Sequence, residues 1–193
     1  MIITIGGKPG SGKSTVARKV AEKLGMKYYS VGDLMGRLAQ ERGMSILEFS
    51  KLAEKDKRID RLLDDAQINL AREDNFVIDS RLGFHFIPNS VKVFLDVDEE
   101  EGARRILQSV KNAERPDEAY LKNIAESMES TRKRVASEKK RYLEYYNVDP
   151  YDLSNYDLLI DTTQMPVEEV VDAVVRYVAD LKAAKEKSEE GKK

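Results

Sequence analysis

The sequence predicts an α/β protein built on a doubly wound, five-stranded parallel sheet, for three reasons. Short apolar segments alternate with stretches of helical spacing. The last three of these segments are apolar at consecutive positions, as strands buried on both faces are. A glycine-rich loop also joins the first segment to a helix. The five expected strands are 2–6, 26–30, 75–79, 91–97 and 156–161. With helices on both faces of the sheet, the fold class is a three-layer α/β/α sandwich.

Caps and spacing mark the helices between these strands. Helices are expected at 14–24, 34–42 and 45–72, and from residues 99 and 167 onward. Gly25 and Gly43 end the first two, and Ser45 is a candidate N-cap with Glu48 three residues later. Residues 183–193 are strongly charged and lack a large apolar side chain, so we expect a frayed, solvated tail there. Residues 1–182 then form one domain.

The composition excludes several classes of protein and site. The chain has 193 residues, 41% of them hydrophobic and 35% charged, with a net charge of −2 and a pI near 5.7. It therefore lacks the basic surplus that attracts nucleic acids or anionic membranes. Without cysteine there are no disulfides, thiolate metal sites or thiol nucleophiles. A bilayer-spanning stretch and a signal peptide are also missing, so we expect a soluble, cytoplasmic protein. We also expect it to be a monomer.

The glycine-rich loop after the first strand fits the phosphate-binding pattern G-x-x-x-x-G-K-[ST] at every fixed position. Its backbone N–H groups and the N-terminus of the next helix favour phosphate oxygens. The expected nucleotide-binding residues are Gly7, Lys8, Pro9, Gly10, Ser11, Gly12, Lys13, Ser14 and Thr15. Lys13 is expected at the β- and γ-phosphates of ATP, and the Ser14 hydroxyl at Mg²⁺. This P-loop in so small a chain favours a metabolic kinase over a motor or switch.

Charged residues follow the second and third expected strands, where ligands bind in open α/β sheets. Arg37 lies about one turn into its helix beyond Asp33, and is suited to hold the phosphate of an acceptor. Asp79 is suited to hold Mg²⁺ directly or through water, and Arg81 to bridge the acceptor phosphate and the transferred group.

A basic helix between residues 131 and 141 is a candidate lid over ATP. Arg134, Glu138 and Arg141 are spaced by four and three residues, so they share one face, where the carboxylate can orient both guanidinium groups. Such a lid would stabilise the charge of the transferred phosphoryl group and exclude water. Arg104 and Arg105, after the fourth strand, are either members of the lid or a solvated helix face, and we favour the solvated face.

Two other functions are open at this point. A P-loop kinase for another nucleotide or a hydroxylated metabolite would need a carboxylate base, for which Asp33 or Asp79 is suitable. A nucleotide-dependent ATPase could instead use its basic helix to bind RNA or a protein partner, although the balanced overall charge argues against this.

The order of these motifs resembles that of the nucleoside monophosphate kinases, and most of all the archaeal-type cytidylate kinases. The resemblance covers residues 1 to about 180 and rests on the P-loop, Ser-x-Gly-Asp before an Arg, the strand-ending Asp-Ser-Arg-Leu and the late Arg-x-x-Ser-Glu-x-x-Arg-Tyr. Two features depart from the family pattern. Gly36 lengthens the turn before Arg37 by one residue, and Asp79-Ser80 replaces the usual pair before Arg81.

The resemblance implies transfer of the γ-phosphoryl group of ATP to CMP or dCMP with Mg²⁺. It implies a helical NMP-binding insert at about 31–73 and a short helical lid at about 109–141. Arg37 and Arg81 would hold the CMP phosphate, while Arg134 and Arg141, oriented by Glu138, would act from the lid. Base recognition is expected in the insert, where the resemblance points to Asp60, Asp64 and Gln67.

Overall fold

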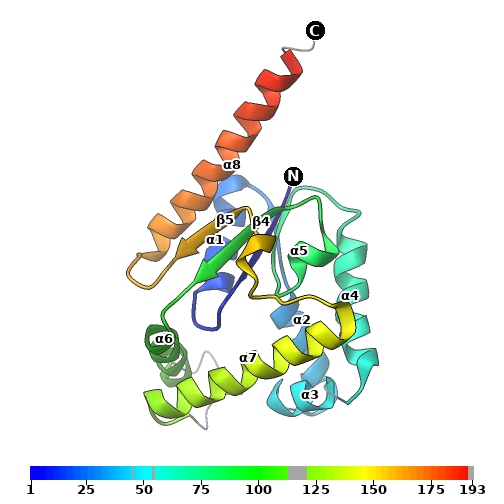
Figure 1. The fold of residues 1–193 in the computed structure, drawn as a ribbon, viewed down its shortest axis with the longest axis vertical. Helices are drawn as coiled ribbons and strands as arrows, with labels where there is room; N and C mark the ends of the chain where they lie inside the picture. Colours follow the sequence, from blue (N-terminus) through cyan, green and yellow to red (C-terminus); the bar gives the residue numbers. More distant parts are fainter. Residues whose placement is uncertain (45, 54, 113–120, 191–193) are drawn as a thin grey trace.

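The computed structural model describes residues 1–44, 46–53, 55–112 and 121–190 (Figure 1). Its centre is a five-stranded sheet with the order β2-β3-β1-β4-β5, in which every neighbouring pair is parallel. The strands are β1 (Ile2–Gly7), β2 (Lys27–Ser30), β3 (Phe76–Asp79), β4 (Val91–Asp96) and β5 (Leu158–Asp161). The predicted fold class is confirmed.

Helices cover both faces of the sheet. They are α1 (Lys13–Leu24), α2 (Val31–Gln40), α3 (Ile46–Ala53), α4 (Lys57–Leu70), α5 (Gly83–Phe86), α6 (Glu99–Lys111), α7 (Ile124–Tyr146) and α8 (Val167–Glu190), with a short 3₁₀ turn at Leu153–Asn155. The α7 helix crosses below the sheet in Figure 1, from α6 to the group formed by α2, α3 and α4. In the part of the chain that the structure describes, no helix is long and apolar enough to cross a membrane.

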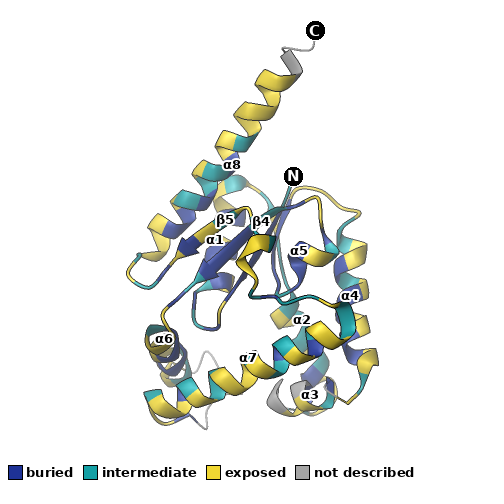
Figure 2. Cartoon of the chain, in the orientation of Figure 1, coloured by how far each residue is buried: buried dark blue, intermediate teal, exposed yellow. Residues whose placement is uncertain are grey.

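Alternation along the strands divides the core between the two faces of the sheet. Ile3, Ile5 and Val77 point toward α1 and α8, whose buried valines and alanines complete that layer. Phe76 and Ile78 point to the opposite face, where they pack with residues near α4 and α5. Figure 2 shows β4 in dark blue at the centre, between helices that are largely yellow on their outer sides.

The second helix begins earlier than expected, and one expected cap cannot be assessed. The α2 helix starts at Val31 instead of residue 34, because the Ser30 hydroxyl accepts a hydrogen bond from the Asp33 N–H at 3.1 Å and so caps the first turn. The predicted N-cap at Ser45 lies outside the described residues.

Two expectations about the C-terminal part are wrong. We expect a fifth strand buried on both faces, but β5 is an edge strand and Leu159 is 50% exposed. A frayed tail is expected from residue 183, but α8 continues through residue 190 (Figure 1). The stretch 183–190 contains Ala, Lys and Glu, which are strong helix formers, and the first glycine after it is Gly191. Residues 183–188 are exposed, as a solvated tail would be.

Candidate active site

The P-loop connects β1 to α1 at the carboxyl edge of the sheet. Gly12 has a φ of 84° and is the N-cap of α1, a left-handed conformation that favours glycine. Gly10 has a φ of 79°, and a Cβ at this position would lie 2.3 Å from the carbonyl oxygen of Gly102 in α6. Both glycines are therefore needed for the loop to turn back against α6 while the first N–H groups of α1 point out of the helix toward a ligand.

Lys13 is buried in the mouth of this loop. Its Nζ donates to the Lys8 carbonyl oxygen at 3.0 Å, and its residue exposure is 8%. Burial, followed by the nearby charge of Arg81, lowers the pKa of Lys13 to about 7, against a smaller opposing effect of Asp79. Without an anion, the site holds more positive charge than it can readily solvate. A polyphosphate chain would relieve this excess.

Two oxygen donors expected at Mg²⁺ lie together beside the P-loop. The Ser14 hydroxyl, in the first turn of α1, donates to Oδ2 of Asp79, at the end of β3. A hydroxyl and a carboxylate suit a hard cation that keeps most of its water ligands, so the pair fits Mg²⁺. No group of three or more acidic, histidine or cysteine side chains that could hold a metal occurs among the residues that the structure describes. Further ligands would therefore come from water and phosphate oxygens.

Glu138 of α7 collects hydrogen bonds from three parts of the chain. Its Oε2 accepts from Arg81 Nε at 2.7 Å and from the Tyr151 hydroxyl at 2.6 Å, and its Oε1 accepts from Arg134 Nε at 3.2 Å. Burial would raise the pKa of Glu138, but the charges of Arg81 and Arg134 outweigh it and lower that pKa to about 2. The carboxylate is therefore ionised throughout the physiological range and links the end of β3 to the lid helix.

The partner of Arg141 differs from the expected one. We expect Glu138 to orient both Arg134 and Arg141, but it contacts Arg134 and Arg81, whereas Arg141 Nε lies 3.3 Å from Asp60 Oδ2. The sequence pattern is misleading because Glu138 and Arg141 share a helix face, yet α4 packs closely enough to offer Arg141 its own carboxylate. Asp60 Oδ2 and Arg141 Nε are buried and make no hydrogen bond of good geometry in the described structure.

The residues expected to recognise the base divide into two groups. Asp60, Asp64 and Gln67 share one buried face of α4. Asp60 pairs with Arg141, and Asp64 accepts a hydrogen bond from the Tyr146 hydroxyl, so both acids face α7. Burial, helped by the charge of Asp60, raises the pKa of Asp64 to about 6.

Gln67 belongs to a different part of the site. It accepts a hydrogen bond from the Ser80 hydroxyl and lines an open pocket of about 510 Å³ with Asp33 and Arg37. This pocket lies between α2 and α4, over the ends of β2 and β3. The structure therefore brings Asp33, Arg37 and Gln67 together, whereas the lining of the pocket does not include Asp60 or Asp64.

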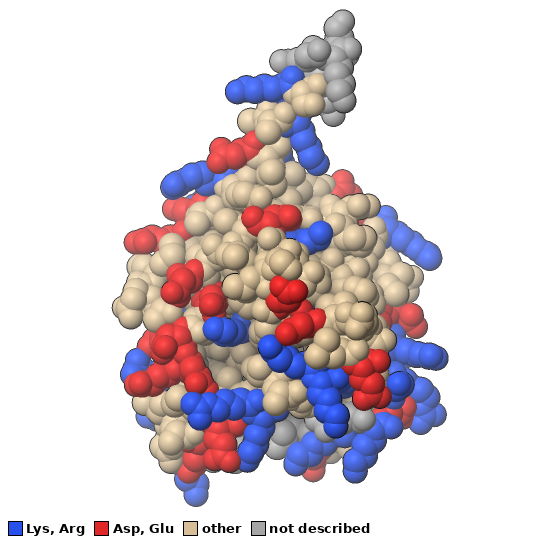
Figure 3. Space-filling model, in the orientation of Figure 1, with Lys and Arg blue, Asp and Glu red and all other residues tan. Residues whose placement is uncertain are grey.

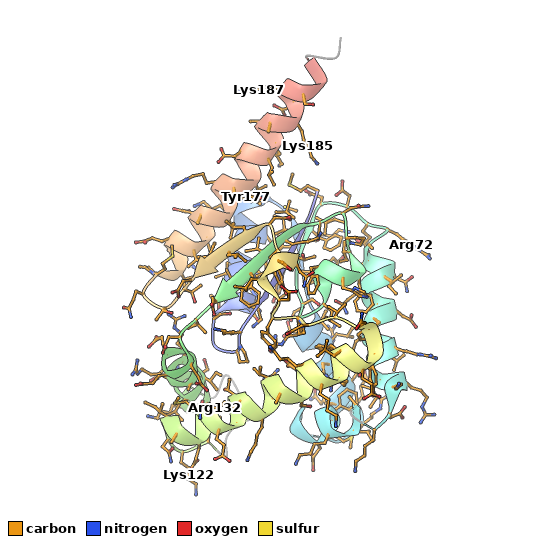
Figure 4. All side chains as sticks on the ribbon, viewed as in Figure 1. Arg72, Lys122, Arg132, Tyr177, Lys185 and Lys187 are labelled. Carbon is orange, nitrogen blue, oxygen red and sulfur yellow. The ribbon has the colours of Figure 1, made fainter. Side chains whose placement is uncertain are left out.

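Most cations of the basic helix are paired with acids. Five of the six lysines and arginines between residues 132 and 141 have a carboxylate partner: Arg132 with Glu99, Lys133 with Glu129, Arg134 with Glu138, Lys139 with Asp149 and Arg141 with Asp60. On the face shown in Figure 3, red and blue side chains are interspersed along α7. Figure 4 shows Arg132 where α7 passes α6, the helix that carries its partner Glu99. This mixed surface does not favour the RNA-binding alternative.

Two residues with a structural part in the site are absent from the sequence-based set. Tyr151 contacts Glu138, and no motif marks it. Arg105, interpreted as part of a solvated face, instead donates to the Thr162 carbonyl oxygen at 2.7 Å and to that of Thr163 at 3.1 Å. Thr162 in turn donates to the Ser11 carbonyl oxygen at 3.2 Å. Arg105 thus supports the P-loop through the segment after β5, so the solvated-face interpretation is wrong for this residue. Arg104 is exposed and pairs with Glu100 and Glu101 of its own helix, as that interpretation expects.

The fold resembles those of solved P-loop kinase structures. A shikimate kinase from Acinetobacter baumannii matches with a TM-score of 0.60 and 18% identity, over 94% of each chain. An uncharacterized protein from Eubacterium ventriosum matches with a TM-score of 0.68 and 22% identity, over 93% of this chain and 98% of that one. At such identities the likeness establishes the fold alone.

Sequence relatives identify the family. A cytidylate kinase of Methanothrix thermoacetophila is 43% identical over 162 residues, which cover 84% of this chain and 88% of the relative. A cytidylate kinase of Methanocaldococcus jannaschii is 39% identical over 184 residues, covering 94% and 99%. The model of the cytidylate kinase-like family matches residues 2–164. The chain therefore belongs to the cytidylate kinase-like family.

Proposed function

We propose that this protein transfers the γ-phosphoryl group of ATP to CMP or dCMP, giving ADP and CDP or dCDP. Family membership supports the reaction. The observation that carries the proposal is a gathering of cations beside the P-loop. Arg81 and Arg134 both donate to Glu138, and the charges of both lower the pKa of Lys13. Three cations close to one point suit the charge that spreads over a phosphoryl group in transfer.

The acceptor would approach from the pocket between α2 and α4. Arg37 lines this pocket and would hold the acceptor phosphate, while Arg81, at the end of β3, would align it for in-line attack. The attacking oxygen belongs to a phosphate that is already ionised, so no general base is required. Gln67 lines the same pocket and is the best placed of the three insert residues to contact a base.

The donor side would be held by the P-loop. The N–H groups of residues 10–15 would contact the phosphates, and Lys13 would lie at the β- and γ-phosphates. Ser14 and Asp79 would hold Mg²⁺, which when bound neutralises phosphate charge and helps to orient the oxygens. Arg134 and Arg141 would approach from α7, the first held by Glu138 and the second by Asp60. Closure of α7 would exclude water from the transferred group.

A coupled assay of ADP release tests the proposal. The protein with ATP and Mg²⁺ should release ADP rapidly with CMP or dCMP, more slowly with UMP or AMP, and at background rate without an acceptor. Shikimate serves as a hydroxyl acceptor in the same panel. A Lys13→Ala variant should lose ATP binding and turnover together. Equal turnover with and without every acceptor would contradict transfer, and preference for a hydroxyl acceptor would contradict the monophosphate assignment.

The proposal includes a monomer that acts in the cytoplasm. Each residue assigned above comes from one chain, so a second copy is not needed to complete the site. Light scattering during gel filtration should give a mass near 21.9 kDa. A mass that remains doubled at nanomolar concentration would contradict the monomer.

A further inference from the structure

Glu138 is a single buried carboxylate on which two of the proposed catalytic arginines depend for their positions. Its side chain is 10% exposed, and both oxygens are used. The bond from Arg81 uses Nε, the inner nitrogen of the guanidinium group, and so does the bond from Arg134. These two bonds hold each guanidinium group by its inner edge and do not themselves involve its terminal nitrogens. The direction in which these nitrogens point depends on the rotation of one carboxylate group.

The third donor to that carboxylate is the hydroxyl of Tyr151, at 2.6 Å from Oε2. A neutral donor stabilises the ionised carboxylate without adding a cation to a site that already contains Lys13, Arg81 and Arg134. Burial and the adjacent charge of Glu138 raise the pKa of Tyr151, so its hydroxyl stays protonated and remains a donor in every working buffer. Because Oε2 accepts from both Tyr151 and Arg81, the hydroxyl limits the rotation that would move Arg81 away.

Tyr151 is itself held by two independent contacts. Its backbone N–H donates to Asp149 Oδ1 at 2.9 Å, and Asp149 pairs with Lys139 of α7 at 3.0 Å. The carbonyl oxygen of Pro150, the residue directly before Tyr151, accepts from the Tyr156 hydroxyl at 2.8 Å. The hydroxyl that reaches Glu138 therefore comes from a braced segment.

Tyr156 connects this segment to the core of the sheet. Its ring packs against Phe94 of β4, with ring centroids 4.9 Å apart. It also lies against Gly6 of β1, because a Cβ at that glycine would be 2.8 Å from the Tyr156 hydroxyl oxygen. The end of β1, from which the P-loop begins, is therefore linked through Tyr156 and Pro150 to the segment that carries Tyr151.

We propose that Tyr151 is a positioning residue for phosphoryl transfer, which acts through Glu138 to aim the guanidinium groups of Arg81 and Arg134 at the transferred group. This inference rests on the function proposed above. In that reaction, Tyr151 would contact no reacting atom. Its contribution is to keep two arginines preorganised, so it should matter more to the chemical step than to the binding of either substrate.

The first test is Tyr151→Phe, which keeps the ring and removes only the hydroxyl. One lost hydrogen bond to a charged group corresponds to a fall in kcat on the order of ten-fold. The KM values for ATP and for the acceptor should change by less than about three-fold. The matched control is Tyr177→Phe on α8, far from the site in Figure 4, which should behave as the parent protein.

A double-mutant cycle distinguishes positioning from a general loss of structure. If Tyr151 acts through Glu138, then Tyr151→Phe added to Glu138→Gln should lower kcat by less than about two-fold beyond the single Glu138→Gln variant. Independent effects would multiply instead. In ¹H–¹⁵N spectra of the arginine side chains, Tyr151→Phe should also move the Arg81 Nε–H resonance, whereas Tyr177→Phe should leave it in place.

Each outcome supports or overturns the inference. A Tyr151→Phe variant with the parent's kcat, or a full ten-fold loss on top of Glu138→Gln, overturns it while leaving the proposed function intact. A loss confined to KM shows that Tyr151 serves binding and overturns it as well. If the parent protein shows no acceptor-dependent release of ADP, the proposed function fails first and this inference falls with it.

Discussion

Lys13 has an unusual environment for a lysine. It is nearly enclosed, and both this burial and the charges of Arg81 and Arg134 lower its pKa. A lysine on the protein surface stays charged well above neutral pH, but this one loses much of its charge near pH 7 when no ligand is present. A bound triphosphate would restore the ammonium form, because negative charge close to an amine raises its pKa. Binding of the nucleotide and uptake of a proton are therefore linked.

This linkage gives the first prediction. At pH 8, Lys13 is mostly neutral in the free protein and charged in the complex, so binding of MgATP should take up about one proton. Calorimetric titration in two buffers with different ionisation enthalpies measures that uptake directly. Lys13→Arg is the control, because its guanidinium group stays charged and should bind without proton exchange. Identical heats for the parent protein in both buffers would contradict the prediction.

Asp64 gives the second prediction. Its pKa in the folded protein is about 6, above its ordinary value of 3.8. Between pH 4 and pH 6, Asp64 is therefore protonated in the folded state and ionised in the unfolded state. Stability should therefore fall as the pH rises from about 4 to 6 and remain lower above it. Asp64→Asn removes this titration, and should raise the free energy of unfolding at pH 8 by about 1–2 kcal/mol while leaving it nearly unchanged at pH 4.

Urea unfolding at the two pH values measures this effect. Asp180→Asn is the control, since that carboxylate lies on the exposed side of α8 and should change stability little at either pH. A stabilisation by Asp64→Asn that is equal at pH 4 and pH 8 would show that the pKa of Asp64 is not raised in the folded protein.

At the scale of elements, α7 joins parts of the molecule that are distant in sequence. Its first turns contact α6, where the Ser127 hydroxyl donates to the Ala103 carbonyl oxygen at 3.0 Å. Its middle carries Glu138, and its last turns face α4 through Arg141 and Tyr146. An element anchored at its start, middle and end would move as one body. Opening of the lid would then disturb the contacts with the insert and with Arg81 at the same time.

The other long helix, α8, gives the third prediction. Its first half is part of the core through Val171, Val174 and Val178, but residues 183–188 project beyond the sheet and are exposed (Figure 2). A chain that ends at residue 182 should keep its melting temperature within about 2 °C and its kcat unchanged. A chain that ends at residue 176 loses Val178, which is 1% exposed, and should melt several degrees lower.

Thermal unfolding followed by circular dichroism, together with the ADP-release assay, measures both truncations. Loss of activity in the chain that ends at residue 182 would mean that the domain extends past that residue.

At the scale of the whole molecule, the insert has a hydrophobic core separate from that of the sheet. Phe49, Ala39, Ala53 and Ile59 form this small cluster, and Phe49 is fully buried within it. The sheet has its own clusters on each face. A fold with two distinct cores can lose order in one of them while the other stays intact. If the insert holds the acceptor and the sheet holds the P-loop, damage to the core of the insert should weaken the binding of the acceptor alone. Damage to the core of the sheet should weaken the binding of both substrates.

Phe49→Ala tests this separation. Truncation of a buried phenylalanine costs about 3–5 kcal/mol, enough to loosen a small cluster. The KM for CMP should rise at least about ten-fold, while the affinity for ATP should stay within about two-fold. The matched control is Phe76→Ala in β3, which should lower global stability and weaken both ligands. Equal weakening of ATP and CMP by Phe49→Ala would show that the two cores act as one.

The sequence predicts the fold better than it predicts the pairing of charges. Buried parallel strands contain runs of consecutive apolar residues, so β3 and β4 are evident from Phe76–Ile78 and Val93–Leu95, and the P-loop has a spacing of its own. The edge position of β5 follows from the order of the strands across the sheet, and the residues of Leu158–Asp161 carry no information about that order. In the same way, Glu138 meets Arg81 across 57 residues, and helical periodicity identifies only partners on its own helix.

The position of β1 in the sheet has a consequence for the order of events during synthesis. Its two neighbours, β3 and β4, end at Asp79 and Asp96, so the strand that precedes the phosphate loop lacks its second partner until about half of the protein has been made. A nascent chain on the ribosome therefore carries its most recognisable motif long before that motif has a shape. Nucleotide can stabilise the growing polypeptide only after β4 has emerged from the exit tunnel.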